Sequence, residues 1–179
     1  MSLTVDDAGM IAGVPYVASP NCDERPAAAA IDLLVIHGIS LPPGEFGGEA
    51  IDRLFTNTLD HGIDPYFESL RNVRVSAHFL IRRDGSLVQY VPCLFRAWHA
   101  GESNWRGRSA CNDFSIGIEL EGSDEVPYAA AQYAALGGLV RTLVMKYQIA
   151  DIVGHSEIAP ARKTDPGPHF DWARFRALL

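Results

Sequence analysis

Residues 115–121 read Ser-Ile-Gly-Ile-Glu-Leu-Glu (SIGIELE), and this stretch is the strongest indicator of the fold. Successive side chains of a β-strand point to opposite faces of the sheet. Apolar and non-apolar residues alternate strictly here, with Ile116, Ile118 and Leu120 on one face and Gly117, Glu119 and Glu121 on the other. The pattern predicts a central strand with one dry face.

Three neighbouring stretches predict the other strands of the same sheet. Residues 31–37 (IDLLVIH) are almost wholly apolar, which is typical of a strand buried on both faces. Residues 78–91 divide around Asp84-Gly85, which predicts a hairpin with a two-residue turn of type I′. Residues 151–154 predict a short last strand that runs directly into His155.

Apolar residues at helical spacing predict helices over residues 50–59 and 128–147. Strands interspersed with helices indicate an α/β (α+β) fold, in which a mixed central β-sheet is flanked by helices. Pro and Gly residues mark residues 1–30 as an extended N-terminal arm over the domain surface. A chain of 179 residues is expected to form a single domain, residues 1–179.

The charge balance argues against two classes of partner. Acidic residues outnumber basic ones, 22 against 15, and the formal net charge is −7. A protein that neutralises phosphates needs the opposite sign, so neither nucleic acid nor an anionic membrane surface is expected as a partner. No stretch approaches the roughly 18 apolar residues of a membrane span.

Cysteine usage and the N-terminus favour the cytoplasm. Cys22, Cys93 and Cys111 are odd in number and contain no C-x-x-C pair, which indicates unpaired thiols in a reducing compartment. Residues 1–13 contain acidic but no basic residues, whereas a secretory signal begins with positive charge.

Residues that can carry chemistry gather at predicted strand ends. His37 ends one strand, His155 follows another, and a polar loop over residues 156–168 holds Lys163 and Asp165. Catalytic groups usually collect at the carboxyl edge of such sheets. Two histidines and a carboxylate match a catalytic zinc site, which uses three protein ligands and keeps an open position.

The same residues suggest roles in an amide hydrolysis. Zinc lowers the pKa of water to about 7, so that hydroxide is available as a nucleophile at neutral pH. Glu119 would carry a proton from water to the leaving amine, and the Lys163 cation would stabilise the oxyanion. His37 and His155 are too far apart for a local zinc signature such as H-E-x-x-H. A structural role for each histidine, and a solvated surface pair of Lys163 and Asp165, therefore stay open.

A resemblance goes further than these spacings. The chain resembles the AmpD-type 1,6-anhydro-N-acetylmuramyl-L-alanine amidases, which are related to phage amidases and peptidoglycan recognition proteins. The matching blocks cover nearly the whole chain: LLVIH (33–37), ISLPPGEFGG (39–48), VSAHFLIRRDG (75–85), RAWHAG (96–101), CNDFSIGIELEG (111–122) and GHSEIAPARKTDPGP (154–168).

The resemblance implies a specific site and reaction. It implies that Zn²⁺ is held by His37, His155 and Asp165, and that Glu119 and Lys163 are catalytic. The implied substrates are 1,6-anhydro-N-acetylmuramyl-peptides, split between the sugar acid and L-alanine during cell-wall recycling in the cytoplasm. In many bacteria this cleavage also limits the muropeptides that induce β-lactamase. A monomer is expected.

Softer candidates for substrate contact flank the matched blocks: Arg74, Trp98 and Arg162. A packed tryptophan and two solvated arginines explain them equally well. Two departures from the family, Gly38 where Asn is typical and Ala110 where several members have arginine, put substrate affinity in question. His78 and His99 are interpreted as residues that orient neighbours or pack.

Two alternatives remain beside the cytoplasmic enzyme. Some peptidoglycan recognition proteins keep the fold but bind fragments without cutting them, although such binders tend to lack one of the five site residues that are present here. A periplasmic amidase acting on intact wall is the second alternative, and the absence of a secretory signal from the sequence argues against it.

Overall fold

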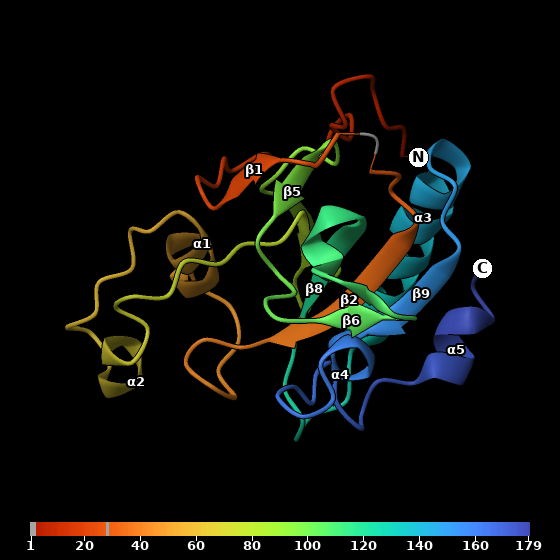
Figure 1. Ribbon diagram of the computed structural model, residues 1–179. Coiled ribbons are helices and arrows are strands. Elements are labelled where there is room, and N and C mark those ends of the chain that lie inside the picture. The colour runs from red at the N-terminus through yellow and green to blue at the C-terminus, as the bar shows by residue number, and fades with distance from the viewer. Residues whose placement is uncertain (1–2, 28) are drawn as a thin grey trace.

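A five-stranded mixed sheet forms the centre of the molecule (Figure 1). The computed structural model describes residues 3–27 and 29–179. In spatial order the strands are β4 (Leu87–Gln89), β3 (Phe79–Ile81), β8 (Ser115–Glu121), β2 (Leu33–Ile39) and β9 (Asp151–Gly154). The strands from β3 to β9 are parallel to their neighbours, and only β4 is antiparallel, to β3. The predicted mixed sheet is confirmed.

Short elements surround this sheet. The small strands are β1 (Cys22–Glu24), β5 (Phe95–Ala97), β6 (Asn104–Trp105) and β7 (Arg108–Ser109). The helices are α1 (Ala50–Phe55), α2 (Pro65–Glu68), the 3₁₀ turn η1 (Cys111–Asp113), α3 (Ala130–Lys146), α4 (His155–Ile158) and α5 (Trp172–Arg176). None of the helices in the described part of the chain is long and apolar enough to cross a membrane.

Strand β8 lies in the middle of the sheet, as its alternation predicts, but both of its faces are buried. One face packs Ile116, Ile118 and Leu120 against α3. The prediction of a single dry face was wrong, because the segment between β5 and β8 folds back over the other face. The ring of His99 lies there against Gly117, where any Cβ would collide with it.

The hairpin between β3 and β4 forms, but with a different turn from the one predicted. Gly85 N donates to Arg82 O (2.9 Å), and among the turn residues only Gly85 has a positive φ, 85°. A type I′ turn needs positive φ at both central residues, so the prediction of that turn type was wrong.

The first helix is also shorter than predicted: α1 ends at Phe55, and Asn57 then adopts a left-handed φ of 60°.

The first part of the N-terminal arm folds back on itself, with an antiparallel bridge between Val5 and Ile11, so this part is not extended as predicted. Residues 1–2 and 28 of the predicted arm lie outside the described residues. Strand β1 pairs with β5. Just beyond it, the guanidinium of Arg25 enters the interior and donates to the backbone oxygens of Asn112 (3.0 Å) and Ser115 (2.8 Å). Burial lowers the pKa of Arg25 to about 10. The arm is therefore attached to the segment that covers β8.

A buried polar network attaches the segment between β2 and β3 to the end of β8. The carboxylate of Glu121 accepts from Gly47 N (2.6 Å) and from Arg82 (3.3 Å), and Arg82 also donates to Asp52 (2.8 Å). Glu121 is only 1% exposed, so these bonds lie in surroundings of low dielectric constant, where hydrogen bonds are electrostatically stronger than in water. They position the residue 40–48 loop beside the carboxyl end of the sheet.

The structure explains why position 38 carries no side chain. A Cβ at Gly38 would collide with the hydroxyl of Tyr128, which donates to Pro166 O (2.8 Å). The space that an asparagine would need is therefore filled by a tyrosine from the segment leading into α3.

We expect Gly38→Asn to lower the free energy of unfolding by about 1–3 kcal/mol, because overpacking a filled site forces neighbours to move. Gly138→Ala is the matched control: nothing lies within 4 Å of its added Cβ, and its place inside α3 predicts a gain of about 0.5–1 kcal/mol. Urea denaturation of both variants measures whether each substitution lowers or raises the free energy of unfolding. A Gly38→Asn protein as stable as the parent would contradict this account.

Candidate active site

Strand register brings three of the predicted site residues together. In the parallel pairing of β2 with β8, His37 is the direct partner of Glu119. In the pairing of β2 with β9, Ile36 is the partner of Gly154, so His155 follows beside His37. These parallel strands present their carboxyl ends at one edge, which is where sheet enzymes place their sites.

Asp165 reaches the same edge from the loop after α4, and the backbone on either side of it is held in place. Asp165 O accepts from Ser156 N at 2.9 Å, and Pro166 O accepts from the Tyr128 hydroxyl at 2.8 Å. One donor belongs to α4 and the other to the segment that leads into α3. The carboxylate of Asp165 is thereby directed at the two histidines.

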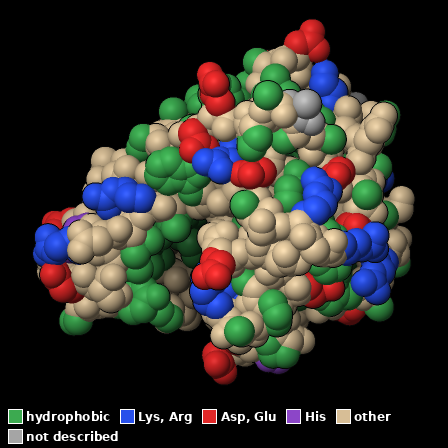
Figure 2. Space-filling model, in the orientation of Figure 1, with side chains coloured by type: hydrophobic (Ala, Val, Ile, Leu, Met, Phe, Trp, Pro, Cys, Tyr) green, Lys and Arg blue, Asp and Glu red, His purple; other side chains and the backbone are tan. Residues whose placement is uncertain are grey.

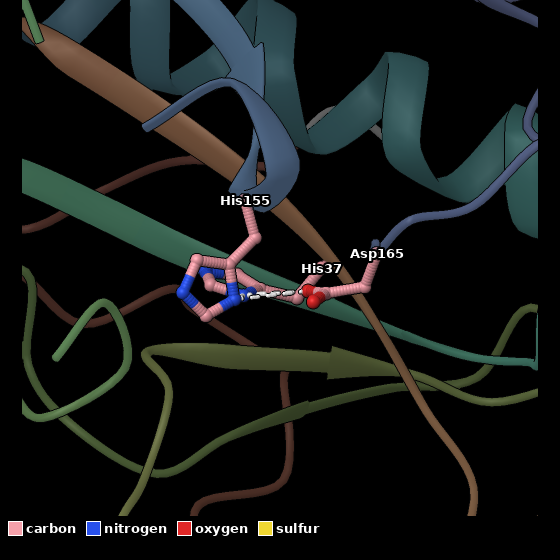
Figure 3. Close-up of side chains that lie close together, drawn as sticks. All are labelled: His37, His155 and Asp165. Carbon is pink, nitrogen blue, oxygen red and sulfur yellow. Dashed lines mark hydrogen bonds and ion pairs between the residues drawn. The ribbon is translucent and has the colours of Figure 1, made fainter. Parts of the chain in front are cut away.

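The three side chains converge on one point (Figure 3). Oδ2 of Asp165 lies 3.0 Å from Nδ1 of His155 and 3.2 Å from Nδ1 of His37, and the two Nδ1 atoms are 3.0 Å apart. One ligand atom from each residue lies within 4.8 Å of the others. Both histidines are buried, at 1% and 2% exposure.

The donor chemistry of this cluster fits a metal ion. Nε2 of His155 lies 3.1 Å from the carbonyl oxygen of Ala100, which can only accept, so this nitrogen carries the hydrogen of the neutral ring. Nδ1 of His155 is then bare and faces a carboxylate oxygen. Two acceptors at this distance repel each other unless a cation lies between them, and a set of two imidazoles and one carboxylate is a donor set that zinc accepts.

Electrostatics keep the cluster ready for a cation. Burial lowers the pKa of His37 to about 4, so its ring is unprotonated at neutral pH. Metal ligands must be deprotonated to bind.

Glu119 lies beside the cluster without a partner. The residue is 9% exposed, and among the described residues its Oε2 atom has no hydrogen-bond partner. Burial, and next the charge of Asp165, raise the pKa of Glu119 well above its usual range. A carboxyl group that moves protons near neutral pH needs a shift in this direction.

These groups open into a cleft of about 670 Å³. The molecule is hollowed between the segment that carries α1 and α2 and the region of α4 (Figure 2). Besides the cluster, the lining includes residues from four parts of the chain: Ser40, Pro43, Gly44, Tyr66, Asp124, Glu125, Arg162 and Lys163. The site is therefore accessible to an extended polar ligand.

The structure brings together all five of the residues that the resemblance implies: His37, Glu119, His155, Lys163 and Asp165 line the same cleft. Of the softer candidates, Arg162 lines it too, and its guanidinium donates to the carbonyl oxygens of Ala100 (2.7 Å) and Glu102 (2.8 Å). Arg74 lines a separate small hollow, and Trp98 is half-buried outside the cleft lining. Ala110 is exposed, with a left-handed φ of 57°.

Sequence reasoning missed the carbonyl of Ala100, which fixes the ring of His155. It interpreted His99 as a residue that orients neighbours or packs, and in the structure Nδ1 of His99 lies 2.9 Å from Nε2 of His37. A signal was present in the strict alternation of β8: Ser115 and Gly117 share a face with Glu119, and a small residue inside a strand marks the close approach of another group.

Comparisons with known proteins agree with this geometry. Residues 27–168 match the family described as N-acetylmuramoyl-L-alanine amidase. The 1,6-anhydro-N-acetylmuramyl-L-alanine amidase AmpD of Salmonella typhimurium (strain SL1344) is 58% identical over 175 residues, covering 97% of this chain and 94% of that protein. A crystal structure of a Se-Met AmpD derivative superposes with a TM-score of 0.95 at 57% identity, covering 98% of this chain and 99% of the other.

A second solved relative carries a ligand. It is described as a complex of the N-acetylmuramyl-L-alanine amidase AmiD from E. coli with the substrate anhydro-N-acetylmuramic acid-L-Ala-D-gamma-Glu-L-Lys. It superposes with a TM-score of 0.61 at 32% identity, covering 88% of this chain and 65% of that one.

The mixed sheet carries a buried carboxyl beside a His-His-Asp cluster in an open cleft, and together with the matches above this places the protein among the hydrolases of the amidase class. The chain belongs to the N-acetylmuramoyl-L-alanine amidase family. Within that family it is of the AmpD type, the 1,6-anhydro-N-acetylmuramyl-L-alanine amidases of peptidoglycan recycling.

Proposed function

We propose that this amidase uses a zinc ion, held by His37, His155 and Asp165, to hydrolyse the amide bond between 1,6-anhydro-N-acetylmuramic acid and L-alanine in muropeptides. The observation that carries the proposal is the convergence of three ligand atoms within 4.8 Å, beside a buried carboxyl group that has no partner among the described residues. The substrate is supported by the names of the AmpD relatives and by the complex of AmiD.

Each polar group of the cleft has a task in this reaction. Zinc supplies Lewis acidity, which polarises a carbonyl and makes water acidic enough to attack it at neutral pH. Glu119 accepts the proton that the attacking water loses and passes it to the amide nitrogen, which leaves as the amino group of L-alanine. The Lys163 cation stabilises the negative charge that develops on the carbonyl oxygen. The hydroxyl of water stays on the lactyl carbon of the sugar, which becomes a carboxylate.

Binding of the substrate is assigned to the cleft walls. Arg162 is a candidate for the peptide carboxylates, because a guanidinium pairs well with a carboxylate. Its bonds to Ala100 and Glu102 also restrict its movement. Arg74 and Trp98 are weaker candidates, since neither lines the cleft, and a contact with substrate would require them to act at its margin.

The remaining assignments concern the cellular setting. We propose a single-domain monomer, residues 1–179, that acts in the cytoplasm and limits the muropeptides that induce β-lactamase. Cys22, Cys93 and Cys111 are free thiols, as is usual in a reducing compartment. A module that binds fragments without cutting them is not favoured, because relatives at 57–58% identity are named as amidases.

Mass spectrometry of anhydro-N-acetylmuramyl-tripeptide incubated with the protein tests this proposal. We expect the anhydro sugar acid and the tripeptide as the two products, no cleavage after a zinc chelator, and recovery when zinc is added back. The chelator is removed before zinc is added, so that recovery reports the metal alone. Full activity in metal-free protein would contradict the zinc assignment. If zinc-loaded protein leaves the tripeptide compound intact, the proposal that anhydro-N-acetylmuramyl-peptides are the substrates is wrong.

A further inference from the structure

A chain of hydrogen bonds runs away from the proposed metal cluster into the protein. Nε2 of His37 lies 2.9 Å from Nδ1 of His99, and Nε2 of His99 lies 3.1 Å from the hydroxyl oxygen of Ser115. That hydroxyl lies 2.6 Å from the carbonyl oxygen of Cys111. His99 is 8% exposed and Ser115 is fully buried, so water takes little part in these bonds.

The direction of each bond follows from the last acceptor. A carbonyl oxygen only accepts, so the single hydroxyl hydrogen of Ser115 is donated to Cys111 O. Ser115 must then accept from Nε2–H of His99. A neutral imidazole has one N–H, so Nδ1 of His99 is an acceptor and receives Nε2–H of His37. The remaining nitrogen of His37, Nδ1, is left without hydrogen, and it is the nitrogen that faces Asp165.

We infer that His99 and Ser115 form a tautomer lock, which holds His37 in the one neutral form whose Nδ1 can ligate a metal. The inference rests on the proposed zinc site. His99 is thus a positioning residue that acts through His37. The two nitrogens of a histidine are distinct, and the bond made by one decides which of them is free for a metal.

The backbone around His99 is built to hold its ring in place. Oδ1 of Asn112 accepts from the backbone N–H groups of His99 (3.2 Å) and Ala100 (2.8 Å). The ring lies edge-on to that of His37, with centroids 5.0 Å apart. The absence of a side chain at Gly117 makes this position available, because any Cβ there would overlap the ring.

A pair of substitutions with the same side-chain branching separates polarity from packing. Asparagine at position 99 offers an acceptor oxygen close to the place of Nδ1, whereas leucine branches in the same way but carries two methyl groups and no acceptor. We expect His99→Leu to weaken zinc binding about 10–100-fold, the usual cost of losing an outer partner of a ligand. His99→Asn is expected to bind zinc nearly as well as the parent. Zinc affinity is measured by competition with a chromogenic chelator, independently of activity.

The hydrogen bond between His99 and Ser115 is tested by substituting two buried serines. We expect Ser115→Ala to weaken zinc binding, because His99 then loses the acceptor that selects its tautomer. Ser19→Ala is the matched control: the Ser19 hydroxyl also donates to one carbonyl, of Phe55, and accepts from one backbone N–H, of Asn21, but it makes no hydrogen bond to a histidine. It should lose similar stability and keep its zinc affinity.

Long-range ¹H–¹⁵N spectra of the histidine rings at pH 8 report the tautomers directly. We expect the hydrogen on Nε2 of His37 in the zinc-free parent and a mixture of tautomers in Ser115→Ala. Equal zinc affinity of His99→Leu and His99→Asn, or a hydrogen on Nδ1 of His37 in the parent, would overturn the lock. If His99→Leu does not fold, the comparison of Ser115→Ala with Ser19→Ala and the spectrum of the parent still test the tautomer lock. Failure of the parent to bind zinc would instead refute the zinc site, while the spectrum would still report on the lock.

Discussion

Replacing Glu119 with glutamine is expected to lower kcat by about 10²–10⁴-fold, the range that a positioned general acid-base group contributes. The amide keeps the shape of the side chain but cannot take up the proton of water. Because Glu119 is not among the three converging ligand residues, the variant should still bind zinc in a 1:1 ratio. Stopped assays on anhydro-N-acetylmuramyl-tripeptide give kcat, and atomic absorption gives the zinc content.

The comparison that isolates this role is Glu125→Gln. Glu125 also lines the cleft, but it is exposed, and no hydrogen bond of its carboxylate to another described residue is present. Loss of its charge should therefore leave most of kcat in place. An equal loss in both variants would point to the overall charge of the cleft, and a Glu119→Gln enzyme with full kcat would remove Glu119 from the proton-transfer step.

Replacing Asp165 with alanine is expected to abolish cleavage and to weaken zinc binding by more than about 100-fold, since even the outer partners of metal ligands cost about 10–100-fold. The carboxylate lies 3.0 Å and 3.2 Å from the two Nδ1 atoms. Its removal leaves two imidazoles, which are too few for a tight catalytic zinc site. Chelator competition measures the affinity.

Asp124→Asn is the control for this change. Asp124 is another carboxylate of the cleft lining, and it makes no contact with His37 or His155 among the described hydrogen bonds. This variant should keep its zinc. Retention of stoichiometric zinc by Asp165→Ala would show that the ion, if bound, has a different set of ligands.

Much of this protein follows from local patterns. The alternation over residues 115–121 and the apolar run over residues 31–37 correspond to β8 and β2 within two residues. Side chains alternate along a strand, and a strand that is buried on both faces is apolar throughout. Helical spacing likewise located α3. The residue blocks of the resemblance identified the family, which the comparisons confirm.

Local patterns were less informative where neighbours in space decide the conformation. The turn at Asp84-Gly85 followed a different geometry from that of its dipeptide signal, since a positive φ occurs at the glycine alone. The early end of α1 and the burial of both faces of β8 are also tertiary effects. At the end of α1 the side chain of Asn57 bonds that of Asn21, and on β8 the ring of His99 covers Gly117, so distant segments contribute at both places.

For the site, the sequence by itself determined which residue types can bind a metal and move a proton: two histidines, two carboxyls and one lysine. Only the tertiary structure decided that His37 pairs in register with Glu119, that Asp165 reaches both Nδ1 atoms, and that His99 rests on Gly117 behind His37. The physical reason is range. A strand pattern depends on burial along a few neighbouring residues, whereas a ligand cluster and its hydrogen bonds join residues up to 128 positions apart, and the register and packing of the whole sheet fix their distances.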